Sequence, residues 1–200
     1  MTGLVDKDLQ NKVKLITQYL DKNFPNVDCE LDFSNNLELI IAVLLSAQCK
    51  DEYVNRATKK LFEKYKTIDD YADAKVEDIE KLIKTLGLYK AKSKNIVGMA
   101  NMLRDVYDYK IPTTREELIK LPGVGRKTAN VVLSVGFNIP AIAVDTHVER
   151  VAKMFGLADK NDNPLQVEKK LMELFPMKDW GKIHHQLIHL GPVSYTHLRA

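Results

Sequence analysis

The sequence predicts an all-α protein of 200 residues. Successive segments repeat apolar residues at helical spacing, which is the pattern of helices with one buried face. No segment alternates apolar and polar residues as a half-buried strand does, and no low-complexity linker interrupts the chain. Hydrophobic residues make up 45% of the sequence and charged residues 28%, which is typical of a soluble globular protein.

The predicted helices follow one another along the whole chain. ELIIAVLLSA is apolar almost all round, which predicts a central helix packed on several sides, whereas several others are amphipathic. Thr113 and Thr114 each precede a glutamate by three residues, which is the pattern of a capping box before REELIKL. The segments are VKLITQYL (13–20), ELIIAVLLSA (38–47), VNRATKKLFEKY (54–65), VEDIEKLIKTLG (76–87), KSKNIVGMANMLRDVY (92–107), REELIKL (115–121), TANVVLSVGF (128–137), THVERVAKMFG (146–156), PLQVEKKLMELF (164–175) and GKIHHQLIHLG (181–191).

Charge, cysteine content and hydropathy narrow the class of protein. The net charge is only +3, so a basic surface for an anionic partner has to be local. Cys29 and Cys49 are too far apart for a metal knuckle and too few for a disulfide scaffold, which favours a reducing cytoplasm. The first ten residues have no apolar core, so we expect no signal peptide. The longest apolar run, residues 39–47, is too short to span a bilayer, so we expect no membrane association.

The stretch LPGVGRKTANVV, residues 121–132, predicts a tight hairpin between two helices. Pro122, Gly123 and Gly125 allow the backbone to approach another molecule, and the N–H groups at the start of the next helix suit a phosphate. Such a hairpin grips a DNA backbone without reading its sequence. A plain αα-hairpin with a C-terminal glycine is the structural alternative, but it accounts for one glycine better than for this group.

A nucleotide-binding loop is a second alternative for this stretch. A Walker loop follows a strand and ends in Gly-Lys-Ser/Thr. Here a helix is expected first, and Gly125 is followed by Arg126, Lys127 and Thr128. A second basic segment favours nucleic acid instead, because Lys81 to Arg104 contains six basic residues and no acidic one. That segment surrounds the turn GLYKAKSKN, although on charge alone a solvated helix face explains it equally well.

Several blocks in one order resemble the endonuclease III family of DNA repair glycosylases, within the helix-hairpin-helix superfamily. The resemblance runs from about residue 10 to Gly191. It implies a bifunctional DNA glycosylase and AP lyase that acts on oxidised pyrimidines in damaged double-stranded DNA as a monomer, in the cytoplasm with the nucleoid. The blocks are LLSAQCKDEYVNRAT (44–58), LGLYKAKSKNI (86–96), LPGVGRKTANVVL (121–133), AIAVDTHVERV (141–151) and HHQLIHLG (184–191).

The resemblance implies that Lys127 is the nucleophile and Asp145 the catalytic carboxylate. A neutral amine can attack C1′ of a flipped nucleotide, expel the base and leave a Schiff base, after which β-elimination cleaves the strand. The helix dipole, the neighbouring Arg126 and burial against a docked base all favour the neutral amine. Without the resemblance, pairing of Lys127 with phosphate is the favoured interpretation, and Asp145 is explained as the N-cap of the next helix.

Further residues carry roles that the resemblance implies. Gln48 and Leu88 are expected to fill the gap that a flipped base leaves, although packing within a loop explains Leu88 equally well. Ser46 and Asp51 flank Gln48 and are expected to touch the nucleotide. The remaining expected DNA contacts are Lys90, Lys92, Lys94, Gly123, Val124, Gly125, Arg126 and Thr128.

The C-terminal part departs from the family pattern. Most members carry four cysteines there, spaced C-x6-C-x2-C-x5-C, which hold a [4Fe–4S] cluster. This chain has none of them, so we expect no cofactor, and residues 192–200 (PVSYTHLRA) are interpreted as a foreign or disordered tail on a truncated frame. A true cluster-free member is the alternative. His185 and His189 have the spacing of a zinc-protease helix, but Gln186 replaces the glutamate base, so we expect no metal.

The resemblance also predicts two helical lobes with a DNA-binding groove between them. Residues 29–139 form one lobe, and residues 1–28 with 140–191 form the other, the chain crossing near FNIPAIAV (137–144). Two other functions remain as alternatives: a monofunctional adenine DNA glycosylase, and a non-catalytic helix-hairpin-helix DNA-binding protein. Lys127 argues against the first, and the pair of Lys127 and Asp145 at the family's spacing argues against the second.

Overall fold

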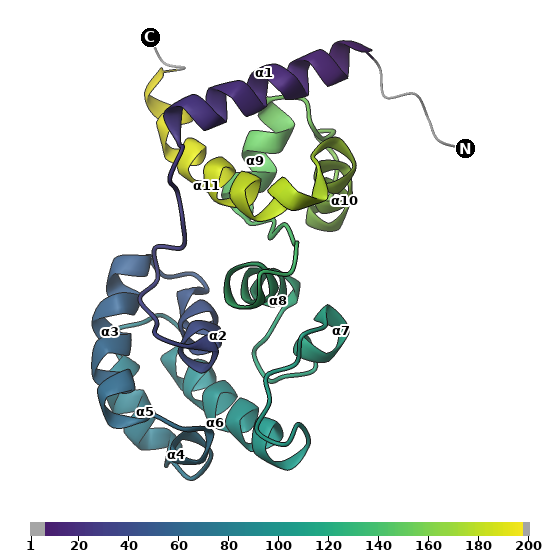
Figure 1. Ribbon diagram of the computed structural model, residues 1–200. Coiled ribbons are helices and arrows are strands. Elements are labelled where there is room, and N and C mark those ends of the chain that lie inside the picture. The colour runs from purple at the N-terminus through teal and green to yellow at the C-terminus, as the bar shows by residue number, and fades with distance from the viewer. Residues whose placement is uncertain (1–6, 198–200) are drawn as a thin grey trace. The chain divides into compact units, whose positions relative to one another are not determined.

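The computed structural model describes residues 7–197, with side chains from residue 7 to 190, and every regular element in this part is helical (Figure 1). The prediction of an all-α protein is therefore confirmed for the described residues. The chain divides into two compact units. One unit contains residues 30–138, and the other contains the chain up to residue 29 and from residue 139 onward. The expected lobes, residues 29–139 and residues 1–28 with 140–191, have boundaries that differ from these by one residue at each junction.

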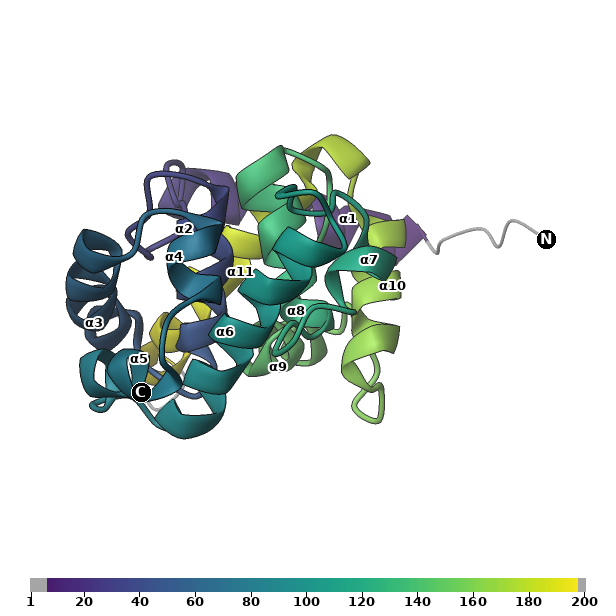
Figure 2. The ribbon, with the colours of Figure 1, turned by 90° about the horizontal axis from the view of Figure 1, so that it is seen from below.

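α2 (Asn36–Ser46) is the central helix of the unit formed by residues 30–138. Residues 39–45 are all at most 4% exposed, because every face of this helix is covered. The Asn35 side chain accepts a hydrogen bond from the Glu38 N–H and caps the helix. α3 (Asp51–Lys64) and α6 (Tyr89–Asp105) pack against it (Figure 2).

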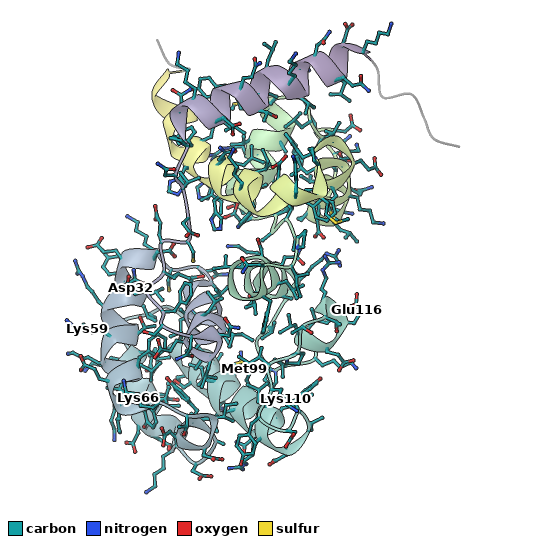
Figure 3. All side chains as sticks on the ribbon, viewed as in Figure 1. Asp32, Lys59, Lys66, Met99, Lys110 and Glu116 are labelled. Atoms are coloured by element: carbon teal, nitrogen blue, oxygen red, sulfur yellow. The ribbon has the colours of Figure 1, made fainter. Side chains whose placement is uncertain are left out.

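Two shorter helices complete the outer side of this unit. α4 (Ile68–Ala72) and α5 (Val76–Ile83) both pack against α6. Met99 of α6 is completely buried inside the unit, while Lys59 and Lys110 lie on its surface (Figure 3). α4 is not among the helices expected from the sequence, although Thr67 and Asp70 form a reciprocal capping box at its start.

The second unit is a cluster of helices from both ends of the chain. It contains α1 (Lys7–Asn23), α9 (Thr146–Met154), α10 (Pro164–Leu174), the 3₁₀ turn η2 (Met177–Asp179) and α11 (Trp180–His197). α11 packs against α1 and α9 (Figure 1).

The core of this unit joins apolar residues that are far apart in sequence. Leu20, Ile142, Val167 and Leu187 are completely buried in one cluster. The Gln186 side chain adds a polar link, because its Nε2 donates to Asp21 Oδ1 and to the Phe24 carbonyl, each at 3.1 Å. The N-terminal helix is therefore held in place by residues near the other end of the chain.

Part of the segment expected to be a foreign or disordered tail, residues 192–200, has a helical backbone. α11 continues through Pro192 and ends at His197. The side chains from Gly191 onward and the whole of residues 198–200 lie outside the described residues. Within the part of the chain that the structure describes, no helix has the length and apolar character needed to cross a membrane.

Burial of His185 makes the stability of this unit dependent on pH. The ring lies beside that of His184, with centroids 4.8 Å apart. Burial lowers the pKa of His185 from its ordinary value of 6.5; the charge of Asp28 acts in the opposite direction, and His189 lowers it further. The unfolded chain therefore takes up a proton at a pH where the folded chain does not, and the free energy of unfolding falls as the pH drops below about 6.5.

Urea denaturation at pH 7.5 and 5.5 measures this effect. The wild-type protein is expected to lose more stability between the two pH values than the His185→Asn variant, whose side chain does not titrate. An equal loss in both proteins would assign the pH dependence to other groups.

Candidate active site and nucleic-acid interface

A short hairpin joins α7 (Arg115–Leu118) to α8 (Arg126–Val131), and α8 continues into a π-helical turn, η1 (Val132–Gly136). Arg115 Nε donates to Asn130 Oδ1 at 2.6 Å, and Asn130 is only 1% exposed. This charge-assisted hydrogen bond ties the two helices on either side of the hairpin together. The hydrogen bond therefore helps to fix the conformation of the loop between the two helices.

The two glycines of the hairpin, Gly123 and Gly125, differ in what their positions require. Gly123 has φ +78°, and a Cβ there would lie 2.7 Å from Asn95 Nδ2 and 2.8 Å from Leu44 Cδ1. The fold itself therefore requires this glycine. Gly125 has φ −91°, and a Cβ there would meet nothing within 4 Å. Its backbone is open to an approaching molecule, and nothing inside the protein requires a glycine at this position.

Lys127 lies in the first turn of α8, directly after this open backbone. Arg126 and Lys127 are exposed, and Thr128 is half-buried. The helix begins with the Ala129 N–H donating to the Gly125 carbonyl at 2.9 Å. Val124 is 6% exposed and anchors the loop in the core, so it supports the hairpin from inside.

Asp145 is the N-cap of α9, as its alternative interpretation predicts. Its Oδ1 accepts hydrogen bonds from the His147 N–H at 2.9 Å and the Val148 N–H at 2.8 Å. The side chain is half-buried, and its orientation is fixed by the start of the helix. Asp145 belongs to the unit that continues from residue 139, whereas Lys127 belongs to the unit of residues 30–138.

A shallow cavity of about 470 Å³ borders α9 beyond Asp145. Three of its six lining residues are basic, and Lys153 donates to the Glu149 carboxylate at 2.5 Å. The excess of positive charge suits a phosphate. The lining residues are Thr146, Glu149, Arg150, Lys153, Met154 and Lys160.

Gln48 and Leu88 share an unusual backbone conformation. Their φ angles are +57° and +59°, in the left-handed region that non-glycine residues rarely adopt. Such a residue costs roughly 1–3 kcal/mol, and strain of this kind is concentrated at functional sites. Both side chains are exposed, and Leu88 is 60% exposed despite being apolar. The alternative for Leu88, ordinary packing inside a loop, does not agree with this exposure.

The residues flanking Gln48 have structural contacts of their own. The Ser46 hydroxyl donates to the Val43 carbonyl at 3.0 Å, in the last turn of α2. Asp51 is the first residue of α3 and is half-buried.

The three lysines after Leu88 do not form one surface. Lys90 and Lys94 are exposed, as a phosphate contact requires. Lys92 is 4% exposed, and its Nζ donates to the Leu45 carbonyl at 2.9 Å and the Ala47 carbonyl at 2.8 Å. The expectation that Lys92 contacts DNA from the surface is therefore wrong, because its ammonium group is already bound to the end of α2.

Metal ligands do not assemble in the described residues. No group of three or more His, Cys, Asp or Glu side chains is placed to hold an ion within this part of the chain. A [4Fe–4S] cluster needs four thiolates close together, and the whole sequence has two cysteines, which lie in different units. The residues present do not fit the cluster. His185 is buried, in keeping with a structural role for the histidines of α11.

The fold and the hairpin define a class of DNA repair protein. Residues 41–177 match the family model described as "HhH-GPD superfamily base excision DNA repair protein". A thermostable thymine-DNA glycosylase, only 20% identical, has the same fold with a TM-score of 0.77 over 92% of this chain and 87% of the other.

More similar proteins narrow this class to one family. Endonuclease III of Bacillus subtilis (strain 168) is 52% identical over 90% of this chain and 83% of its own length. Endonuclease III of Escherichia coli (strain K12) is 43% identical over 88% and 83%. A solved structure of a trapped endonuclease III–DNA covalent intermediate is 49% identical, with a TM-score of 0.89 over 92% of this chain and 86% of the other. The chain belongs to the endonuclease III family, whose members are DNA glycosylases with AP lyase activity.

Proposed function

We propose that this enzyme removes oxidised pyrimidines from damaged double-stranded DNA and then cleaves the strand 3′ to the abasic site. The Lys127 amine attacks C1′ of the nucleotide, and the C1′–N bond breaks as the base leaves. The C1′–O4′ bond of the sugar ring then opens, O4′ takes up a proton, and the resulting Schiff base makes the C2′ proton acidic. Loss of that proton expels the 3′ phosphate by β-elimination, and hydrolysis returns the amine.

The observation that carries this proposal is the position of Lys127 beside Gly125. Lys127 is exposed and comes two residues after Gly125, where an added Cβ would have no atom within 4 Å. A phosphate backbone can therefore approach the hairpin closely and place a sugar near the amine. The similar solved structure is described as a covalent endonuclease III–DNA intermediate, which supports a nucleophile on the protein.

Asp145 is proposed to stabilise positive charge on the opening sugar and to assist proton transfer. Its role as N-cap supports this proposal, because the two backbone N–H donors hold one carboxylate oxygen in place. A preorganised carboxylate does not have to be reoriented as charge develops. Gln48 and Leu88 are proposed to occupy the gap left by the flipped nucleotide, and Lys90 and Lys94 to contact phosphates.

Borohydride trapping tests the function directly. The protein is incubated with duplexes that carry thymine glycol, an abasic site or no lesion. Covalent complexes are expected with the first two and not with the third, because trapping needs a Schiff base at C1′. Base release from an adenine mismatch without any trapping would favour the monofunctional alternative, and binding without base release or trapping would favour the non-catalytic one.

Asp145→Asn is expected to separate the catalytic role of this residue from its structural one. The carboxamide oxygen can still accept both N–H groups, since asparagine is a favoured N-cap, so the melting temperature should stay near the wild-type value. The single-turnover rate of base excision should fall by about 100-fold or more. Asp145→Ala is the matched variant and should also lose about 0.5–2 kcal/mol of stability. A wild-type rate for Asp145→Asn would leave Asp145 only its role as a cap.

The partners and setting proposed here follow the family. We propose that the protein is a monomer that acts in the cytoplasm with the nucleoid. We also propose that these 200 residues bind no [4Fe–4S] cluster. Iron analysis and visible absorption of the purified chain test the last point. Stoichiometric iron would contradict it.

A further inference from the structure

Lys92 is a buried lysine of α6 whose ammonium group is directed at the C-terminal end of α2. In addition to its bonds to the Leu45 and Ala47 carbonyls, Nζ lies 3.3 Å from Cys49 Sγ. A buried ammonium group is unfavourable unless its donors are used, and these three contacts match its three N–H groups. The carbonyls at a helix end lack partners within the helix, so Lys92 also supplies what the end of α2 needs.

The contacts of Lys92 lie on both sides of Gln48. Ala47, whose carbonyl it binds, comes directly before Gln48, and Cys49 comes directly after it. The Cys49 N–H donates to the Ser46 carbonyl at 3.0 Å, which closes the turn. One side chain thus fixes the two neighbours of a residue whose own backbone is in the left-handed region.

The same lysine is linked to Leu88 through the main chain. Leu88 precedes α6, and the Lys92 N–H donates to the Leu88 carbonyl at 3.0 Å, in the first turn of that helix. The two loops also approach each other, because a Cβ at Gly87 would lie 3.9 Å from Cys49 Sγ. Lys92 therefore connects the segment that carries Leu88 to the segment that carries Gln48.

We propose that Lys92 is a positioning residue that locks the loop of Gln48 to the start of α6, so that Gln48 and Leu88 are presented to the duplex as one preformed unit. The inference rests on the proposed insertion of these two side chains into DNA. A preformed arrangement avoids the cost of ordering two loops during binding. That benefit applies to a duplex with a gap to fill, and an undamaged duplex gains little from it.

The test compares two dissociation constants, measured by fluorescence anisotropy at one salt concentration. One duplex carries a tetrahydrofuran abasic-site analogue, and the other has the same sequence without a lesion. The ratio is the dissociation constant for the undamaged duplex divided by that for the duplex with the abasic-site analogue. Lys92→Met is expected to lower this ratio by about tenfold, because the two insertion loops are then no longer held in order before binding. The dissociation constant for undamaged DNA should change by less than about twofold. Circular dichroism at the measuring temperature checks that the variant is folded. Lys92→Gln, which keeps an N–H donor on a shorter side chain, is the second variant and should give an intermediate ratio.

Lys94→Met is the matched control on the same helix. Its side chain is exposed, so it should weaken binding to both duplexes by the same factor through loss of a phosphate contact. A double-mutant cycle adds a second criterion. Gln48→Ala should lower the ratio in the wild-type protein and change it by less than about twofold in the Lys92→Met background, because both substitutions remove the same positioned side chain.

The outcomes separate the inference from the function on which it rests. Equal loss of affinity for both duplexes in Lys92→Met, or an undiminished effect of Gln48→Ala in that background, overturns the positioning role and leaves Lys92 as a stabilising contact. If Gln48→Ala does not change the ratio in the wild-type protein, the proposed insertion of Gln48 is wrong, and the inference falls with it.

Discussion

Lys127→Ala is expected to abolish the borohydride-trapped complex with abasic duplex and to slow strand cleavage by on the order of 10⁴-fold or more, because in the proposed mechanism this amine forms the covalent bond to C1′. The side chain is exposed, so the melting temperature should change by no more than about 2 °C. Binding to the same duplex should largely persist, since phosphate contacts supply most of the affinity. Gel analysis of trapped complexes and anisotropy measure the two effects separately.

Lys110→Ala is the control for this experiment. Lys110 is an exposed lysine of the same unit, paired with Asp108 at 3.4 Å, and it lies on the surface outside the hairpin (Figure 3). Its alanine variant should trap as the wild-type protein does. If Lys127→Ala still traps DNA, the attacking amine comes from another residue and the proposed mechanism is wrong.

Gly123→Ala is expected to produce the largest loss of stability, about 2–5 kcal/mol. The estimate combines a left-handed backbone, at roughly 1–2 kcal/mol, with overpacking, at roughly 1–3 kcal/mol. The new methyl group would collide with Asn95 and Leu44, at distances below 3 Å. Chemical denaturation of the wild type and the variant measures the difference.

Gly125→Ala is the matched substitution in the same loop. Its backbone angles suit any residue and the Cβ position is open, so stability should change by less than about 0.5 kcal/mol. Affinity for DNA should nevertheless decrease, because the methyl group occupies the space through which a phosphate backbone approaches. Unchanged affinity in a stable Gly125→Ala protein would remove the hairpin from the DNA interface.

The fold class could be predicted from the sequence because helical periodicity is a property of the chain itself. The helices that were missed are short: α4 has five residues and η2 has three. A segment of that length holds at most about one turn of the apolar repeat, so periodicity cannot detect it. The only local signal for α4 was the spacing of Thr67 and Asp70, and a capping box without an apolar run after it is weak.

The candidate site could be predicted in part. The cluster of glycines before Arg126 and Lys127 is local in sequence, and the structure forms the expected hairpin there. The left-handed conformation of Gln48 and Leu88 could not be predicted, because neither residue type favours it and tertiary contacts impose it.

Lys92 shows a different limit of sequence reasoning. It was assigned to the surface because of its charge and its neighbours. A usable signal was present, since the buried stripe of Ile96, Met99 and Leu103, continued backward by one turn, reaches Lys92. Periodicity then predicts burial, but only the structure identifies the carbonyls of α2 that make burial of an ammonium group tolerable.

The division of the chain also has a consequence for its synthesis. The unit of residues 30–138 is continuous, so it can fold as soon as it leaves the ribosome, whereas α1 belongs to a unit whose other helices begin after residue 139. At roughly 5–20 residues per second, α1 waits on the order of 5–20 s for the intervening segment alone. During that time its apolar positions, Ile16 and Leu20, have none of their native partners from α9 to α11. α1 therefore emerges before its packing partners exist, and it stays without them throughout the synthesis of the other unit.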